Sequence, residues 1–508
     1  LDIGDVVHAR DYFLDKAYRA ESGRQAFYES CFTAVDEIQT YFQEMEGKTF
    51  QSALEDFKKA FQKLAKDPSD SVRQNLVVQK AGLFLSRSQS VYEGLKSYQS
   101  NINTKVSQDI DKINKLGHKI HELNQQISKI EAGGIETAMD LRDERDLALD
   151  QLGALAKISY KEDYKGVVTV KLEDEYFVDE LHTYEIGKKT DKLTGFITPY
   201  WPQLSDTDRD IYVNVFDFNV DISTALNSDV GELKALIMSR GDHWADYSDI
   251  EGKGEQEYLD TTNLSVIIDM QAKLDQMVHN MITAINDQLC PNVTGPVGVT
   301  YQDANGNTVN LSDAKVLDTE NCARGSDGEL PPRELFVRAG IERYTEVTGS
   351  DGKTYYVYNE EDTSDTSYMY SLTSCGVNEE LKKIETLFPH LKQNGEVDQQ
   401  LGERLEALWN KDLVGLDPTD PDECNIEEYY QKMIGGLATV GNVYQKKAEN
   451  LAGSVLTIEN NRQQVIGVSS DEELQNMIKF QNAYNASSRF MTVISDMIEH
   501  IVTRLGNG

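Results

Sequence analysis

Proline is scarce in this chain, with ten residues in 508 and none between Pro68 and Pro199 or after Pro421. Proline breaks helices because it lacks a backbone N–H and clashes with the preceding turn. The two long tracts 69–198 and 422–508 therefore contain no proline that would interrupt a long helix.

Long apolar runs and clustered cysteines are also missing. No run approaches the roughly 18 apolar residues that a membrane-spanning helix needs, so we expect no membrane contact. The five cysteines lie far apart, with no CxxC pair and no Cys/His cluster. This spacing argues against a zinc site and a disulfide framework, and scattered structural thiols are favoured.

Positive charge is in short supply. The chain has 50 Lys and Arg against 86 Asp and Glu, a formal net charge of −36. Such a surface repels phosphate backbones, so nucleic-acid binding is unfavourable. The most acidic stretches, 242–260, 360–365 and 417–428, lack the ligand spacing and turn glycine of a calcium loop and are interpreted as solvated surfaces.

The usual catalytic and cofactor motifs are absent too. GxxxxGK[ST], GxGxxG, GxSxG and HExxH do not occur. His118 and His121 lie off an apolar helical stripe, which favours an exposed helix face over a metal site. We therefore predict no catalytic, cofactor-binding or metal-binding residues, and a protein that is not an enzyme.

What the sequence does contain is long helical periodicity. A regular stripe of spacing three and four predicts one long packed helix; its members are Ile102, Val106, Ile110, Ile113, Leu116, Ile120, Leu123, Ile127 and Ile130. A further helix is expected over 137–155, with Leu141, Leu147, Leu149, Leu152 and Leu155 as its apolar side. Others are expected over 11–66, from 71, over 260–289, from 378, and from 426 to the end.

Two segments alternate with a period of two, which is typical of half-buried strands. The first runs from Lys165 to Gly254 and includes Val168, Val170 and Leu172, with a further strand expected over 212–218. The second covers 291–374, with hairpin turns at Asn305-Gly306 and Asp351-Gly352.

The predicted fold is a multidomain α+β protein. An elongated antiparallel helical-bundle trunk, ending in a coiled-coil helix, is interrupted by two antiparallel β-rich domains. The expected divisions are helical trunk over 1–158, a β-rich domain over 159–257, a returning helix over 258–290, a second β-rich domain over 291–375, trunk again over 376–468, and a terminal assembly helix over 469–508.

The terminal segment carries four heptads. Met477, Tyr484, Met491, Ile498 and Leu505 share one heptad position, and Phe480, Ser487, Ile494 and Ile501 lie three residues later. Ser470 and Glu473 form a capping box at its start. Such a stripe predicts a helix that packs against another helix. Docking on its own domain is the alternative. We take all of these positions except Ser487 as the assembly interface: Met477, Phe480, Tyr484, Met491, Ile494, Ile498, Ile501 and Leu505.

Four stretches resemble the flagellar hook-associated protein 1 (FlgK) family. They are 10–19 (RDYFLDKAYR), 139–152 (MDLRDERDLALDQL), 467–473 (GVSSDEE) and 480–489 (FQNAYNASSR). The last is shared widely among flagellar rod, hook and hook-associated proteins. The interrupted trunk and the Asp-rich stretch narrow the resemblance to this family. The family's pairing helix at the amino terminus is not found before Leu1.

The resemblance implies a structural junction between hook and filament in the bacterial flagellum, and hence a role in motility. The implied partners are the hook protein, hook-associated protein 3, further copies of the chain in a ring, and a type III export chaperone on the C-terminal region. Export through the flagellar type III apparatus would follow. Other axial proteins, such as hook-associated protein 3 or a flagellin-like protein, and a secreted glycan-binding stalked adhesin are the alternatives.

Overall fold

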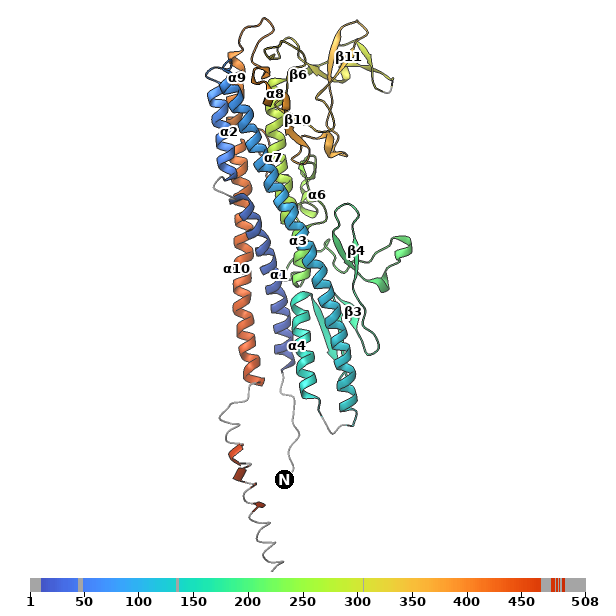
Figure 1. Cartoon of the computed structure of the whole chain (residues 1–508). Coiled ribbons are helices and arrows are strands. Elements are labelled where there is room, and N and C mark those ends of the chain that lie inside the picture. The colour runs from blue at the N-terminus through green and yellow to red at the C-terminus, as the bar shows by residue number, and fades with distance from the viewer. Residues whose placement is uncertain are drawn as a thin grey trace, which may run out of the picture.

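The computed structural model describes residues 11–43, 49–133, 137–304, 306–466, 477–479, 481, 482, 484, 487 and 488, and ten α-helices lie within residues 11–466. The helices are α1 (Tyr12–Gln43), α2 (Phe50–Leu64), α3 (Ser71–Glu131), α4 (Met139–Leu155), α5 (Glu232–Arg240), α6 (Glu255–Asp260), α7 (Val266–Leu289), α8 (Glu379–Lys383), α9 (Gln399–Ala407) and α10 (Ile426–Ile466). Figure 1 shows the longest of them running along one axis, with the strands gathered on one side.

The trunk is built around α3, whose 61 residues span about 90 Å at 1.5 Å per residue. Helix α1 packs along α10, and α4 packs against both α1 and α3 at the lower end of the trunk in Figure 1. Residues near the two ends of the chain, Tyr12 and Ile466, therefore belong to helices that lie side by side. The elongated α+β architecture expected from the sequence is confirmed.

The predicted stripe on α3 joins the main core from Ile102 to Ile120, and Leu123 and Ile127 form a separate small cluster with Ala138. From Ile102 to Ile127 its apolar members are all buried. Each large apolar side chain that leaves water contributes about 1.5–3 kcal/mol, so the eight buried members account for much of the packing of this helix. Ile130 departs from the prediction, because 41% of it is exposed near the end of α3. Leu147 on α4 is likewise exposed, at 54%.

The first predicted helix is two helices. Thr49 is an N-cap in extended conformation, and its Oγ1 accepts a hydrogen bond from the Ser52 amide at 2.9 Å. Such a cap starts a new helix, so the expected single helix over 11–66 is wrong. The separate α2 then folds its Phe face back on α3, with Phe57 stacked on Phe84 at 5.7 Å between ring centroids.

Within the described residues, all paired strands are antiparallel and form five small sheets. The strands are β1 (Ile158–Glu162), β2 (Val168–Leu172), β3 (Glu175–Val178), β4 (Gly187–Thr190), β5 (Ile197–Tyr200), β6 (Asn292–Thr294), β7 (Thr300–Gln302), β8 (Thr308–Asn310), β9 (Lys315–Leu317), β10 (Phe336–Arg338), β11 (Tyr344–Thr348), β12 (Thr354–Tyr358) and β13 (Cys375–Val377). The sheet orders are β1-β2-β3, β4-β5, β7-β8, β10-β13 and β11-β12-β9-β6.

The segment between α4 and α7, residues 156–265, leaves the trunk and is called the first excursion. It differs in two places from the β-rich domain predicted there. Residues 212–218 form no regular strand: Val215 donates to the Pro199 carbonyl and Trp201 to the Val213 carbonyl, and the ladder stops there. Pro199 has no N–H with which to extend the pairing. Helix α5 also interrupts the expected β segment. Its apolar residues are buried on all sides, so no amphipathic period marks it.

The second excursion follows α7 and contains both predicted hairpins. Gly352, between β11 and β12, has φ of 77°, and Gly306, between β7 and β8, has φ of 80°. Glycine adopts this left-handed backbone without steric cost, which explains its place in both turns. The segment returns to the trunk through β13, which Gln89 of α3 fixes by donating to the Cys375 carbonyl at 3.1 Å.

Candidate assembly site at the base of the trunk

Two of the eight predicted interface residues fall within the described chain. Met477 and Tyr484 are helical, and they are 59% and 75% exposed. The other six lie outside the described residues: Phe480, Met491, Ile494, Ile498, Ile501 and Leu505. The Ser470 and Glu473 capping box also lies outside them. The two described side chains are therefore apolar groups left largely in solvent beyond the end of α10.

The end of α10 is fixed by one arginine. Arg462 is 5% exposed, and its Nε donates to Asp15 Oδ1 on α1 at 2.7 Å. Its Nη2 donates to Asp150 Oδ2 on α4 at 2.8 Å, and its Nη1 to Glu459 on its own helix at 3.0 Å. The guanidinium also lies 4.2 Å from the centroid of the Tyr18 ring. One side chain thus joins the three helices that end at the base of the trunk.

A second arginine completes this cluster. Arg19 of α1 is 3% exposed, and its Nε donates to Asp150 Oδ1 at 2.6 Å. Its Nη2 donates to Asp146 at 3.1 Å. Asp150 therefore lies between Arg19 and Arg462, with one carboxylate oxygen for each. We call these five residues (Asp15, Arg19, Asp146, Asp150 and Arg462) the base cluster.

The electrostatics of the base cluster favour its charged form. Burial alone would lower the pKa of Arg462, but hydrogen bonding and attraction to Asp150, with Asp15 and Glu459 adding to them, leave that pKa raised. Arg19 behaves in the same way beside Asp150 and Asp146. Buried ion pairs of this kind fix geometry, because breaking one leaves an uncompensated charge. The cluster therefore holds the last turns of α10 against α1 and α4.

The base cluster was not predicted from the sequence, although four of its five residues lie in stretches that carry the family resemblance; Arg462 lies in none of them. Asp15 and Arg19 belong to the 10–19 stretch, and Asp146 and Asp150 to the 139–152 stretch. The spacing of these charges could have indicated them. Asp15 and Arg19, like Asp146 and Asp150, are four residues apart, which places both charges of each pair on one helix face. Which helices meet at that face is not contained in the pattern.

Helix α4 also holds the first excursion. Arg145 is 2% exposed and donates to Asn124 Oδ1 of α3 at 3.0 Å and to the Gly166 carbonyl of the β1–β2 turn at 2.5 Å. Arg142 binds both oxygens of Glu131 at 2.7 and 2.6 Å. That bidentate hydrogen bond lowers the pKa of Glu131. The acid-rich helix thus joins trunk and sheet through two arginines.

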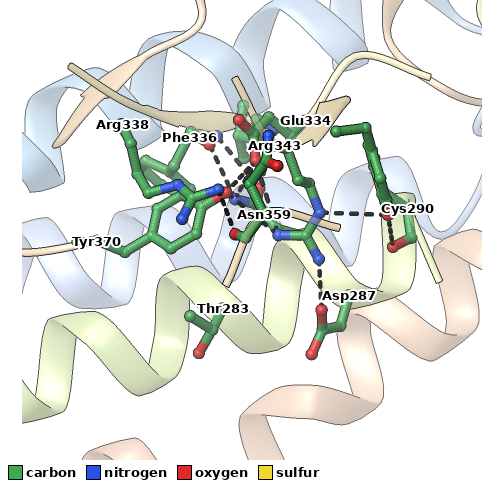
Figure 2. Close-up of polar contacts among 12 residues, drawn as sticks. Thr283, Asp287, Cys290, Glu334, Phe336, Arg338, Arg343, Asn359 and Tyr370 are labelled. Carbon is green, nitrogen blue, oxygen red and sulfur yellow. Dashed lines mark hydrogen bonds and ion pairs between the residues drawn. The ribbon is translucent and has the colours of Figure 1, made fainter. Parts of the chain in front are cut away.

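A comparable buried group anchors the second excursion to α7 (Figure 2). Arg343 donates through Nη2 to Asp287 of α7 at 2.5 Å and through Nη1 to the Tyr370 hydroxyl at 3.2 Å. The same hydroxyl donates to Glu334 at 2.5 Å. Burial raises the pKa of Glu334 to about 7. Glu334 and Arg343 are 6% and 3% exposed, and this buried pair holds the excursion in place with the more exposed Asp287 at its edge.

Three other features of the described part of the chain are its potential metal ligands, the length and hydropathy of its helices, and its cysteines. Within it, no group of three or more His, Cys, Asp or Glu residues could hold a metal ion. Its helices include none that is long and apolar enough to cross a membrane. All five cysteines are described, buried and free. His118 is exposed, as expected, and its Nε2 lies 2.6 Å from Glu185.

Comparison with known proteins gives two family matches. Residues 35–299 match the flagellar hook-associated protein FlgK helical domain. Residues 463–504 match the flagellar basal body rod FlgEFG protein C-terminal region. The second match covers the end of α10 and nearly all of the predicted heptads, so the terminal pattern is of a kind found beyond one flagellar protein.

Full-length relatives and a solved structure agree with these matches. Flagellar hook-associated protein 1 of Bacillus subtilis (strain 168) is 23% identical over 523 residues, covering 99% of this chain and 85% of the relative. That of Salmonella typhimurium is 18% identical over 519 residues, covering 98% and 89%. The flagellar hook junction protein FlgK from Burkholderia pseudomallei has the same fold, with a TM-score of 0.53 and 12% identity, over 89% of this chain and all of that one. Because the helical-domain match alone covers more than half of the sequence, the chain belongs to the FlgK family of flagellar hook-associated proteins.

Proposed function

We propose that this chain is a structural component of the bacterial flagellum that joins the hook to the filament. Family membership over nearly the whole length supports this role. The structural observation that carries it is the base of the trunk. There, the base cluster fixes the end of α10, and the next described apolar residues, Met477 and Tyr484, are exposed. A rigid trunk would in this way present an unpaired helix to its partners.

The terminal segment 469–508 acts as the assembly element in this proposal. Its interface residues bury their heptad face against helices of neighbouring subunits. Each large apolar side chain contributes about 1.5–3 kcal/mol, which outweighs the ordering entropy only when most of them find partners. Assembly is then cooperative, and the segment becomes ordered with it. The trunk and the two β-rich excursions, divided as the sequence predicts, form the remainder of the subunit.

The proposed partners follow from this arrangement. The subunits form a ring that meets the hook protein on one side and hook-associated protein 3 on the other. Before assembly, a cytoplasmic chaperone covers the C-terminal region, and the chain leaves the cell through the flagellar type III apparatus. A structural role of this kind requires no catalytic residue.

Substitution in the heptads tests the proposal. In a strain whose own copy is deleted, we expect the pair Met491→Asp and Ile498→Asp to abolish filament attachment. Secretion of the subunit into the medium should continue. As a control, Thr503→Asp adds a single carboxylate on the opposite side of the predicted helix and should leave attachment intact. Electron microscopy of hooks and immunoblots of the medium give the two readouts. Normal filaments on hooks carrying the doubly substituted subunit would contradict the proposal.

A further inference from the structure

A cavity of about 490 Å³ lies where the first excursion meets the trunk. Its walls come from β5, the extended segment 214–219, and helices α5 and α7 with the turn before α7. The apolar part of the lining includes Phe216, Phe218, Ile237, Met238, Leu264 and Ile268. The volume and the mainly apolar lining are those of a site for a small organic group.

The wall of this cavity contains a buried cation, Arg240, which is 1% exposed. Its Nε donates to the Gly241 carbonyl at 2.9 Å, and its Nη1 to Asn103 Oδ1 at 2.7 Å and the Ile197 carbonyl at 3.0 Å. These acceptors are all uncharged. Among the described residues, no Asp or Glu forms an ion pair with this guanidinium. Burial lowers the pKa of Arg240 to about 10, with only Asp242 opposing the shift.

Apart from Asp260, which accepts a hydrogen bond from a neutral amide, the other charges around the cavity are paired with one another. Asp242 binds His243 Nδ1 at 2.6 Å, and Asp249 lies 3.2 Å from the Nε2 of the same ring. Lys253 lies 3.3 Å from Asp249. Asp260 accepts a hydrogen bond from Gln256 at 2.9 Å. In a chain with a net charge of −36, a buried guanidinium with no carboxylate partner is therefore a marked departure from the local pattern.

Buried charges are normally paired, because removing an ion from water costs several kcal/mol that only a partner offsets. Guanidinium pairs best with a carboxylate, whose two oxygens match its planar donors. We propose that this cavity binds a carboxylate carried on an apolar body, with the carboxylate paired to Arg240 and the apolar body against Phe216, Leu264 and Ile268.

This site goes beyond the junction role, which needs no ligand. Its walls belong both to the first excursion and to α7 of the trunk, so an occupant would tie the two together. Two sources share the required chemistry: a free fatty carboxylate, and the terminal carboxylate of a peptide that ends in apolar residues. The site is small enough to take only the last one or two residues of such a peptide.

The test uses the full chain and two matched pairs of probes. Octanoate is compared with octanamide, and acetyl-Leu-Phe with its C-terminal amide, by calorimetry and by thermal shift. We expect at least one acid to bind and to raise the melting temperature, and its amide to bind at least tenfold more weakly. Octanoate binding indicates a free ligand, and peptide binding indicates a protein terminus.

Three variants locate the binding. Arg240→Gln should weaken binding of the acid at least tenfold, and Leu264→Trp, which fills the cavity, should abolish it. Arg209→Gln removes an exposed cation of the same excursion, with a side chain that is 79% exposed, and should change nothing. If Arg240→Gln does not fold, Leu264→Trp and the amide probes still decide the question. Failure of both acids to bind, equal binding of acid and amide, or unchanged binding by Leu264→Trp would overturn the proposal.

Discussion

Replacement of Arg462 by methionine is the sharpest test of how the base of the trunk is held. Methionine keeps most of the length and apolar volume of the side chain while removing the guanidinium. The change takes away the ion pairs to Asp15 at 2.7 Å and to Asp150 at 2.8 Å, together with the contact to the Tyr18 ring. Asp150 keeps its bond to Arg19 at 2.6 Å.

The expected cost follows from burial. Removing one member of a buried ion pair typically costs about 3–5 kcal/mol, because the remaining charge stays desolvated. The retained pairing of Asp150 with Arg19 places the cost here at the lower end, at about 3 kcal/mol. A loss of that size raises the opening equilibrium of the local helix more than about a hundredfold, at 1.36 kcal/mol for each factor of ten.

Amide hydrogen exchange is the suitable assay, because a long chain with several packed parts need not unfold in a single step. We expect exchange over residues 450–465 to accelerate more than about a hundredfold in Arg462→Met, with little change over residues 426–440. Lys446→Met is the matched control, since it removes the same charge from an exposed position on the same helix. Equal effects of Arg462→Met and Lys446→Met would refute the role of the base cluster.

Two further predictions concern pH and helix α10. The pKa of Glu334 rises from 4.5 to about 7, chiefly through burial, so the folded chain keeps a proton that the unfolded chain releases. Stability should fall by roughly 3 kcal/mol as pH rises through this window, and Glu334→Gln should remove that fall in denaturant titrations. Gly436→Ala, which meets no neighbour within 4 Å, should stabilise the chain by up to about 1 kcal/mol, whereas Gly441→Ala would place Cβ 2.8 Å from Val35 and should destabilise it.

Each of these two experiments has a result that would contradict its prediction. A pH slope that is the same with Glu334→Gln would show that the buried carboxyl does not exchange its proton on unfolding. Equal and positive effects of the two glycine substitutions, measured as shifts in the denaturation midpoint, would show that α10 is not packed against α1 at Gly441.

Much of the trunk could be predicted from the sequence, because its helices pack with one face and expose the other. The α3 stripe from Ile102 to Ile127 repeats every three or four residues and is buried as expected. The same reasoning failed for α5, since Leu233, Lys234 and Arg240 are all buried and the helix has no exposed face to set a period. The strand expected over 212–218 does not form, because Pro199, which lies outside that segment, has no N–H to continue the pairing.

The candidate assembly site could likewise be predicted from the sequence only in part. Heptad spacing was sufficient to propose the interface residues over 477–505, because a helix that meets another helix repeats its contacts. The base cluster depends on Asp15, Asp150 and Arg462, which are more than a hundred residues apart from one another in the chain. Only the packing of α1, α4 and α10 against one another brings these charges together.

The central claim is that residues 477–505 gain their helical partners on assembly, and hydrogen exchange tests it most directly. The amides of this segment would be compared in the isolated chain and in the chain assembled on purified hooks. We predict rapid exchange in the isolated chain and strong protection after assembly, while residues 102–127 of α3 stay protected in both. Strong protection of the segment in the isolated chain, or no gain on assembly, would contradict the account.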